Sequence, residues 1–259
     1  MVRRLMSVDT KPPTKVAEGP VSRFLFVVHR GGSIFLHDKV AAPLSRDLGL
    51  MCTDLGTYLF KYPPSEKAPY VGMPWGRFYS KIYVPFHPFI RLPPRCKAAC
   101  IIRDPRDVAV STYYSLAYSH PLLPGEDPRA RIARQRAMRQ QGLKQWTIEE
   151  GLPVAEMELR AALSLSQRSS GVRLFKYEEM VTDWPVFLRG LFRWFGVGEE
   201  LDEKYLELSG EFNPKGEDIL SHKRQVRPGN WRRLFDSGLE QAAREIIGTS
   251  LGSAGYSWD

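Results

Sequence analysis

The chain has 259 residues, 43% of them hydrophobic, and a formal net charge of +8 at pH 7. This length suits one large domain with an ample core, and the 20 prolines and six tryptophans argue against a simple helical bundle. No apolar run approaches the length of about 20 residues that a membrane-spanning helix needs. The basic excess favours anionic ligands: nucleic acid, phosphorylated cofactors, acidic substrates or anionic lipid.

The first twenty residues carry charges and prolines but no apolar stretch of the kind found in signal peptides. We expect residues 1–20 to form a flexible N-terminal lead-in and residues 21–259 to form the folded domain. The cysteines, Cys52, Cys96 and Cys100, lack the spacing of a zinc site. They predict reduced, buried thiols in a cytoplasmic protein.

Short apolar runs alternate with helical patterns along the chain. The continuous apolar run at 23–28 is typical of a strand buried on both faces, and the segment that follows has its apolar residues at helical spacing. Strands are predicted at 23–28, 50–55, 81–85, 98–102 and 172–176, and helices at 34–48, 105–118, 129–169 with a break near 151–153, 184–195 and 238–250. Residues 61–78, rich in Pro, Gly and Tyr, predict an irregular excursion. The alternation predicts an α/β fold: a single domain with a central parallel β-sheet flanked by helices.

The most informative stretch lies at 97–118. Its apolar strand ends in Arg103-Asp104-Pro105, where Asp104 suits a helix N-cap and Pro105 the first helical position, and Asp107 stands where a capping-box acid would. This break places Arg103 at the carboxyl end of a strand, where α/β sheets bind ligands. The plainer interpretation is a strand–helix joint with a surface arginine.

A second candidate site follows the first strand, in His29-Arg30-Gly31-Gly32-Ser33. Two glycines between a buried strand and a helix allow backbone N–H groups to curl around an anion, and the helix N-terminus adds partial positive charge. The loop is P-loop-like, but it lacks the G-x-x-x-x-G-K-[ST] spacing of a Walker A motif. A tight turn without a ligand is the alternative.

Two further segments are strongly basic. Residues 222–233 hold five cations and a histidine around Pro228 and Gly229, which predicts either a solvated surface loop or a lid over an anion. Residues 129–144 hold six cations and no acid, and the simplest interpretation is a solvated helix face.

Together these segments resemble the family of sulfotransferases that use 3′-phosphoadenosine 5′-phosphosulfate (PAPS). Residues 103–114, RDPRDVAVSTYY, closely match the family's R-D-P-R-D-x-x-x-S-x-Y-Y pattern. Arg224 to Trp231 match the R-x-G-x-x-G-x-W loop in part, and Tyr177 to Met180 match the Y-E-D-x element in part. The closing GYSWD matches the G-Y-x-W-D tail. The resemblance covers residues 22–259 and identifies 21–259 as a sulfotransferase domain.

The resemblance implies a set of site residues. The 5′-phosphosulfate would be held by Arg30, Gly31, Gly32, Ser33 and Ile34, and the 3′-phosphate by Arg103 and Ser111, with Arg224 and Gly229 completing that pocket. Tyr177 would touch the nucleoside, and Phe35 stands where the family often has a tryptophan stacked on adenine. Arg30 replaces a usual lysine, and Gln225 and Val226 replace the lysine and glycine common in the last loop.

Transfer of a sulfuryl group to a hydroxyl or amine requires cations at the leaving oxygen and a general base at the acceptor, and no metal. The resemblance implies that Arg30 is the catalytic cation. His87, between a strand and the Arg103 strand, is the first candidate for the base, as in many cytosolic-type members; His29 is the second and Asp54 the third. The products are 3′,5′-ADP (PAP) and a sulfated acceptor.

The acceptor class stays open among a small molecule, a glycan, a lipid and a carrier-bound intermediate. No nucleic-acid partner and no transmembrane segment are expected. The rival interpretations are a P-loop-type nucleotide kinase, disfavoured by the missing Walker lysine and serine, and a non-enzymatic basic module that binds anions or nucleic acid.

Overall fold

The computed structural model describes residues 21–61, 73–93, 95–120, 122, 125–198, 202–212 and 226–259. The expected lead-in at 1–20, most of the excursion at 61–78, and Arg224 with Gln225 lie outside these residues.

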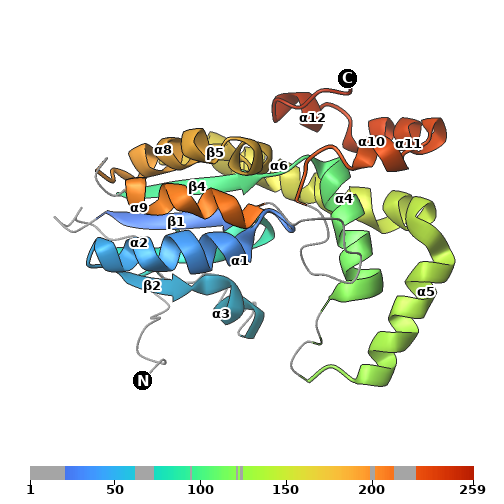
Figure 1. Cartoon of the computed structure of the whole chain (residues 1–259), viewed down its shortest axis with the longest axis horizontal. Coiled ribbons are helices and arrows are strands. Elements are labelled where there is room, and N and C mark those ends of the chain that lie inside the picture. Colours follow the sequence, from blue (N-terminus) through green and yellow to red (C-terminus); the bar gives the residue numbers. More distant parts are fainter. Residues whose placement is uncertain are drawn as a thin grey trace.

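The described residues form a five-stranded, all-parallel sheet in the order β2-β3-β1-β4-β5 (Figure 1). The strands are β1 Ser22–Val27, β2 Met51–Asp54, β3 Arg77–Tyr83, β4 Cys96–Ile102 and β5 Val172–Lys176. Helices connect the strands and cover both faces, so the predicted fold class is confirmed.

The central strand shows why a continuous apolar run was needed. Leu25 and Val27 of β1 enter one buried cluster, whereas Phe24 and Phe26 enter another on the opposite face. All four side chains are at most 1% exposed. Because successive side chains of a strand point to opposite faces, a sheet covered on both sides requires apolar residues at every position.

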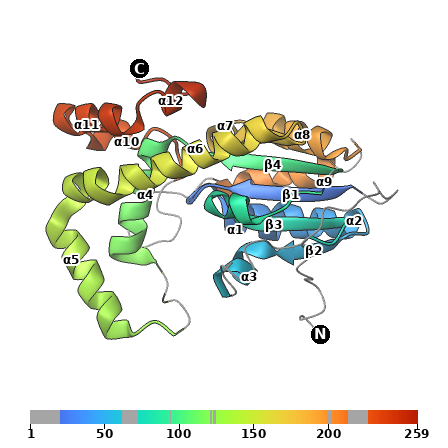
Figure 2. The same ribbon diagram turned by 180° about the vertical axis from the view of Figure 1, so that it is seen from behind.

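The helices divide between these two clusters, as the two opposite views of the ribbon show (Figures 1 and 2). The first cluster receives α1 Ser33–Phe35, η2 Leu36–Ala41, α2 Ala42–Asp47, α7 Tyr177–Thr182, α8 Trp184–Phe195 and α9 Asp202–Leu206, and the second receives α3 Leu55–Lys61, η3 Val84–Phe89 and α6 Leu152–Arg168. The remaining helices are α4 Pro105–Tyr114, η4 Ser115–Ser119, α5 Pro128–Trp146, η5 Thr147–Gly151, η7 Glu207–Phe212, α10 Trp231–Leu234, α11 Ser237–Ile247 and α12 Ser250–Ser253.

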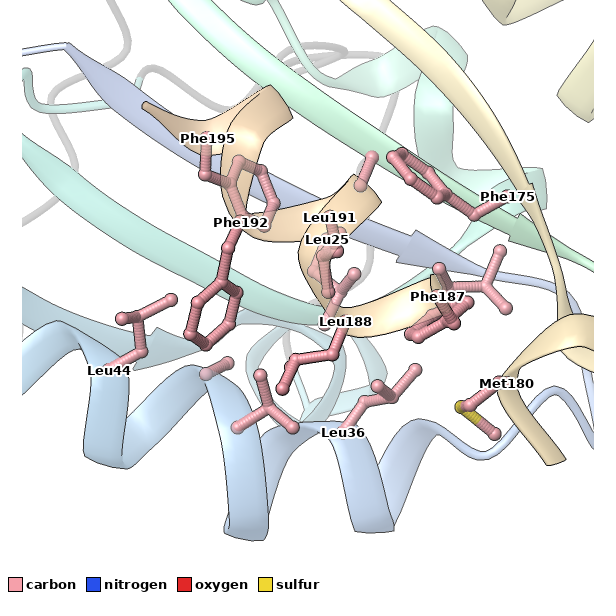
Figure 3. Packing of buried hydrophobic residues seen from close by; sticks show 14 of the residues in the cluster. Leu25, Leu36, Leu44, Phe175, Met180, Phe187, Leu188, Leu191, Phe192 and Phe195 are labelled. Carbon is pink, nitrogen blue, oxygen red and sulfur yellow. The ribbon is translucent and has the colours of Figure 1, made fainter. Parts of the chain in front are cut away.

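Aromatic side chains of α8 fill the first cluster. Figure 3 shows Phe187, Phe192 and Phe195 along α8, with the Phe192 ring directed towards Leu44 of the helix that starts at Ser33. Each of the three rings is at most 2% exposed. The helix ends at Gly196, which adopts φ 69°, as the sequence predicts for a C-terminal glycine.

Three predicted boundaries were wrong. β3 spans Arg77–Tyr83 rather than 81–85, because Pro85 has no N–H to donate and falls in the 3₁₀ helix η3. The helix α3 spans Leu55–Lys61, where the sequence predicted a strand end at Leu55, an irregular segment from residue 61 and no helix between them. The long helical region breaks at Gly142 (φ 82°, ψ 161°) and not near 151–153, where a π-helical turn, η5, leads into α6.

An irregularity in β3 depends on a neighbouring glycine. Tyr79 lies opposite Phe24 and Ile82 opposite Phe26, so β3 carries one extra residue there, and Lys81 has φ 54°. A Cβ atom on Gly56 of α3 would lie 2.1 Å from the backbone oxygen of Lys81. Only glycine fits at this approach.

We therefore expect Gly56→Ala to lower the free energy of unfolding by about 2 kcal/mol, at the scale of other overpacked positions. The measurement is urea denaturation followed by circular dichroism. The matched control is Gly252→Ala, since no atom lies within 4 Å of the Cβ position of Gly252 in α12. Equal stability of the two variants would contradict this interpretation of the bulge.

Candidate active site

Three loops meet at the carboxyl edge of the sheet. They follow β1, β4 and β5, which are adjacent in the strand order. Because parallel strands end at the same edge, segments near residues 30, 103 and 177 come together from distant parts of the sequence (Figure 1).

The loop after β1 is joined directly to α4. Arg30 Nε donates a hydrogen bond to Ser111 Oγ at 3.2 Å, and Arg103 Nη1 donates to the backbone oxygen of Arg30 at 2.8 Å. Arg30 adopts φ 62°, an uncommon conformation for a residue with a Cβ atom. The structure thus brings together three of the predicted site residues: Arg30, Arg103 and Ser111.

Gly32 gives this loop its close fit against α7. It adopts φ 83°, and a Cβ atom on it would lie 2.9 Å from Met180 Cε and 3.7 Å from the Tyr177 ring. Gly31 is equally confined, because its Cβ would lie 2.8 Å from Val27 Cγ1. The two glycines therefore let the backbone turn tightly into the helix that starts at Ser33.

Arg103 is a buried cation. It is 4% exposed, its guanidinium lies 4.2 Å from the centre of the Tyr177 ring, and its Nε has no hydrogen-bond partner. No carboxylate of the described residues forms an ion pair with it, although its charge lowers the pKa of the nearby carboxyl groups of Asp107 and Glu178 against the effect of their burial. A buried cation of this kind calls for an anion, so this position fits a phosphate-type ligand.

The segment at 226–231 closes over this corner of the sheet. Tyr177 Oη donates to the backbone oxygen of Val226 at 3.3 Å, and the N–H groups of Gly229 and Trp231 donate to Asp107 at 2.6 and 3.1 Å. Asp107 therefore holds this loop and does not form the predicted capping box. Burial raises the pKa of Asp107, although Arg103 and the two N–H donors partly offset that effect.

Arg106 attaches the chain end to α4. Its guanidinium lies between Trp231, at 3.8 Å, and Trp258, at 4.6 Å, and forms a two-point ion pair with Asp104 at 2.9 and 2.7 Å. It also donates to the backbone oxygen of Ser257 at 2.7 Å. We call Arg106, Asp107 and the segments that they hold, 226–231 and 256–259, the C-terminal latch.

Glu178 connects the β4 and β5 loops. It accepts hydrogen bonds from the backbone N–H of Asp104 at 2.9 Å and from Tyr256 Oη at 2.8 Å. Burial raises the pKa of Glu178, and burial together with Glu178 raises the pKa of Tyr256. Glu178 lies directly after Tyr177. Of these two residues, Tyr177 contacts the site residue Arg103, and Glu178 binds Tyr256 near the chain end.

The three residues that follow the β1 loop, Ser33 to Phe35, differ in exposure and in the residues that they contact. Ser33 Oγ lies 3.5 Å from Tyr83 Oη, and Ile34 is 50% exposed. The Phe35 ring packs edge-on against Trp184, with 5.8 Å between ring centres. Its predicted stacking on adenine stays a prediction.

The three candidate bases occupy different environments. His29 pairs with Glu158 of α6 and stacks on Tyr83. His87 is half-buried in η3, with Nδ1 3.0 Å from the Val84 backbone oxygen, and burial lowers its pKa.

Asp54 forms an ion pair with Lys81 at 2.8 Å and accepts from the N–H of Thr57 at 2.9 Å. Burial raises the pKa of Asp54, but the bonds from Lys81 and Thr57 outweigh burial, so its pKa lies below the ordinary value. The pairing makes Asp54 a weak base.

Sequence reasoning missed Glu158. It is 1% exposed and stands on the apolar face of α6, three residues after Ala155 and four before Ala162. A charged residue inside an apolar helical stripe was the signal, because such a side chain requires a polar partner.

The basic segment at 129–144 lies on α5, which extends from the body of the sheet (Figure 2). Several of its cations bind nearby oxygens: Arg131 pairs with Glu126, Arg139 donates to the Ala117 backbone oxygen, and Lys144 pairs with Asp236. The predicted solvated helix face agrees with the exposure of most of its side chains.

Two negative findings concern the described residues alone. They contain no group of three His, Cys, Asp or Glu side chains that could hold a metal ion. None of their helices has the length and hydropathy needed to cross a membrane.

Comparison with known proteins identifies the family. A family model described as the sulfotransferase domain matches residues 73–253. The chain belongs to this family. The predicted enzyme class, a sulfotransferase, is thereby confirmed. The β1 loop lies before residue 73, where the match to the family model begins.

Solved structures agree on the fold. Mouse sulfotransferase SULT7A1 complexed with PAP matches with a TM-score of 0.55 and 16% identity, over 90% of this chain and 85% of that one. Retinol dehydratase in a complex with retinol and PAP matches with a TM-score of 0.52 and 16% identity, over 94% and 84% of the two chains. No curated protein matches this chain significantly in sequence.

The latch around Asp107 is testable by proteolysis. We expect Asp107→Asn to speed trypsin cleavage after Arg232 and Arg233 by about tenfold, because a hydrogen bond to a charged group contributes about 1.5–3 kcal/mol. Cleavage sites are read by mass spectrometry. Glu245→Gln, which alters an exposed side chain bonded to Gln241, is the control. Equal cleavage of both variants would show that Asp107 does not hold the loop.

Proposed function

We propose that this sulfotransferase transfers a sulfuryl group from PAPS to a hydroxyl or amine of an acceptor. The observation that carries the proposal is the direct contact among Arg30, Arg103 and Ser111, which come from two loops and a helix at one sheet edge. The family to which the chain belongs, and the PAP bound in the two sulfotransferase-fold structures, support the same donor.

The residues present fit a doubly phosphorylated nucleotide. Arg103 is buried with an unpartnered Nε, which suits it to the 3′-phosphate together with Ser111. Gly31 and Gly32 leave no room for a Cβ atom on their inner sides and keep the backbone close to the helix N-terminus, which suits the 5′-phosphosulfate. Tyr177 would contact the nucleoside, and Gly229, held by Asp107, would close the pocket.

Each side chain has a physical task in this arrangement. When bound, PAPS supplies the activated sulfuryl group and a phosphate as the leaving group. Arg30 places positive charge where negative charge develops, and its bond to Ser111 restricts the rotation of its long side chain. Ser33 adds a hydroxyl and a backbone N–H at the first turn of the helix. These groups act by position and charge, so the protein need form no covalent bond.

The structure supports a choice of acceptor class but not of an individual acceptor. We propose a small-molecule, glycan, lipid or carrier-bound acceptor that reaches the site beside Tyr83, and no nucleic acid. Retinol is bound in one structure of the same fold, which supports a small molecule. A cytoplasmic location is also proposed, because Cys52, Cys96 and Cys100 form no disulfide.

The donor site predicts a selective stabilisation. At 100 times its dissociation constant, PAP raises the apparent free energy of unfolding by about 2.7 kcal/mol. ATP with Mg²⁺, the ligand of the kinase alternative, and an oligonucleotide, the ligand of the basic-module alternative, are expected to give no comparable shift. Stabilisation by ATP with Mg²⁺ but not by PAP would reject the proposal.

Arg103→Lys is expected to raise the dissociation constant of PAP about 100-fold by calorimetry, since lysine cannot reproduce the forked, ring-stacked guanidinium. Arg173→Lys is the matched control, because Arg173 lies exposed on β5, the neighbouring strand. Unchanged PAP affinity in Arg103→Lys would remove Arg103 from the binding site.

A further inference from the structure

A histidine and a buried glutamate form a pair beside the β1 loop. The backbone N–H of His29 donates to Glu158 Oε2 at 2.8 Å, and His29 Nδ1 is hydrogen-bonded to Glu158 Oε1. Glu158 is 1% exposed, whereas the His29 side chain is 42% exposed. The carboxylate is therefore fixed inside the fold, and the imidazole lies between it and the open side of the loop.

Glu158 decides which nitrogen of His29 carries the proton. Both of its hydrogen bonds within the described residues come from His29, so this residue alone compensates its burial. A carboxylate accepts and does not donate, so Nδ1 must hold the hydrogen. In the neutral ring, Nε2 then carries a lone pair.

Tyr83 fixes the plane of the imidazole. Its ring stacks on His29 with 4.4 Å between centres and 13° between planes, and its hydroxyl lies 3.5 Å from Ser33 Oγ. The same tyrosine therefore touches both the histidine and the phosphosulfate loop. Among the described residues, Nε2 of His29 has no hydrogen-bond partner.

We propose that His29 is the general base of the reaction and that Glu158 and Tyr83 are its positioning residues. The inference rests on the proposed sulfuryl transfer. The acceptor hydroxyl gives its proton to His29 Nε2 while its oxygen bonds to sulfur; the bond from sulfur to the phosphate oxygen breaks, and its electron pair stays on the departing PAP. Glu158 balances the imidazolium charge, and the exposed ring passes the proton to water.

His87, the other histidine candidate, is less accessible to an acceptor than His29. His87 Nε2 is buried and has no hydrogen-bond partner. Its Nδ1 lies 3.0 Å from the backbone oxygen of Val84, so the nitrogen left to accept a proton is the buried Nε2. The geometry therefore favours His29 over His87.

Glu158→Gln separates a catalytic from a merely structural role. An amide can donate to Nδ1, which moves the ring hydrogen to Nε2 and removes the lone pair that the base needs. We expect kcat to fall about 100-fold while the dissociation constant of PAP changes less than about twofold. Turnover is measured as sulfate transfer from labelled PAPS to unsubstituted phenol, whose hydroxyl is protonated at neutral pH and therefore needs a base.

The tautomer supplies a readout that does not depend on turnover. Long-range ¹H–¹⁵N spectra report which ring nitrogen of His29 is protonated, and we expect Nδ1–H in the wild-type protein and Nε2–H in Glu158→Gln. Glu158→Asp keeps the carboxylate, so it is expected to keep the Nδ1–H form and recover part of kcat. Glu156→Gln, a buried glutamate on the same helix that pairs with Ser250, is the matched control.

His29→Gln serves as the second variant if the Glu158 variants do not fold. The side chain of His29 is partly exposed, so its replacement disturbs the core less than replacement of the buried Glu158. His29→Gln is expected to lose as much kcat as Glu158→Gln, and the double variant no more than either. Near-normal kcat in His29→Gln with full PAP binding, or loss of kcat in His87→Gln, would overturn the inference. Failure of the wild-type protein to bind PAP would instead reject the proposed function, and the spectra would still test the pair.

Discussion

The site depends on a buried arginine that forms no ion pair with a carboxylate of the described residues, although the charges of Asp107 and Glu178 lie near it. Arg103 leaves β4 at the carboxyl edge of the sheet, lies on the Tyr177 ring and donates to the backbone of Arg30. Desolvating a guanidinium is costly, so its burial must be compensated by hydrogen bonds, a ring face and, in function, an anion. The loops after β1, β4 and β5 are therefore not independent: each supplies one of the groups around this cation. We therefore expect a substitution in one loop to change the contacts that the other two make around Arg103, even where the substituted residue does not contact a ligand.

The neighbouring arginine shows the opposite solution. Arg106 is 1% exposed but has a two-point ion pair with Asp104 and two tryptophan faces. Its interactions are structural, and they attach the chain end to the first turn of α4. Each of the two guanidinium groups keeps one buried nitrogen without a hydrogen-bond partner, Nε of Arg103 and Nη1 of Arg106. Within four residues, the motif thus contains one arginine that pairs with a carboxylate of the protein and one that forms no ion pair among the described residues. This difference distinguishes Arg103, the proposed binding residue, from Arg106 of the latch. The sequence pattern alone does not distinguish them, because it contains both arginines.

Sequence reasoning succeeded where local rules decide the structure. The buried strands, the Asp104 N-cap and the Gly196 helix end follow from patterns a few residues long. It failed where distant segments decide. Asp107 has the spacing of a capping box, yet its carboxylate serves the backbone of Gly229, 122 residues away. The pairing of His29 with Glu158 likewise joins residues 129 apart, and only the fold brings them together. The closeness of Arg30, Arg103 and Ser111 was foreseeable, because parallel strands must end at one edge.

The position of Tyr83 depends on the irregularity in β3. The extra residue at Ser80–Lys81 interrupts the alternation of side chains, so that Tyr79 and Ile82 both enter the second cluster and Tyr83 falls opposite Val27, at the start of the β1 loop. A regular strand would have placed residue 83 on the same face as residue 79. The left-handed conformation of Lys81 that this requires is accommodated by the absence of a side chain at Gly56. A glycine in α3 thus permits the bulge, the bulge directs Tyr83, and Tyr83 holds the imidazole of His29 beside the loop that the donor would occupy.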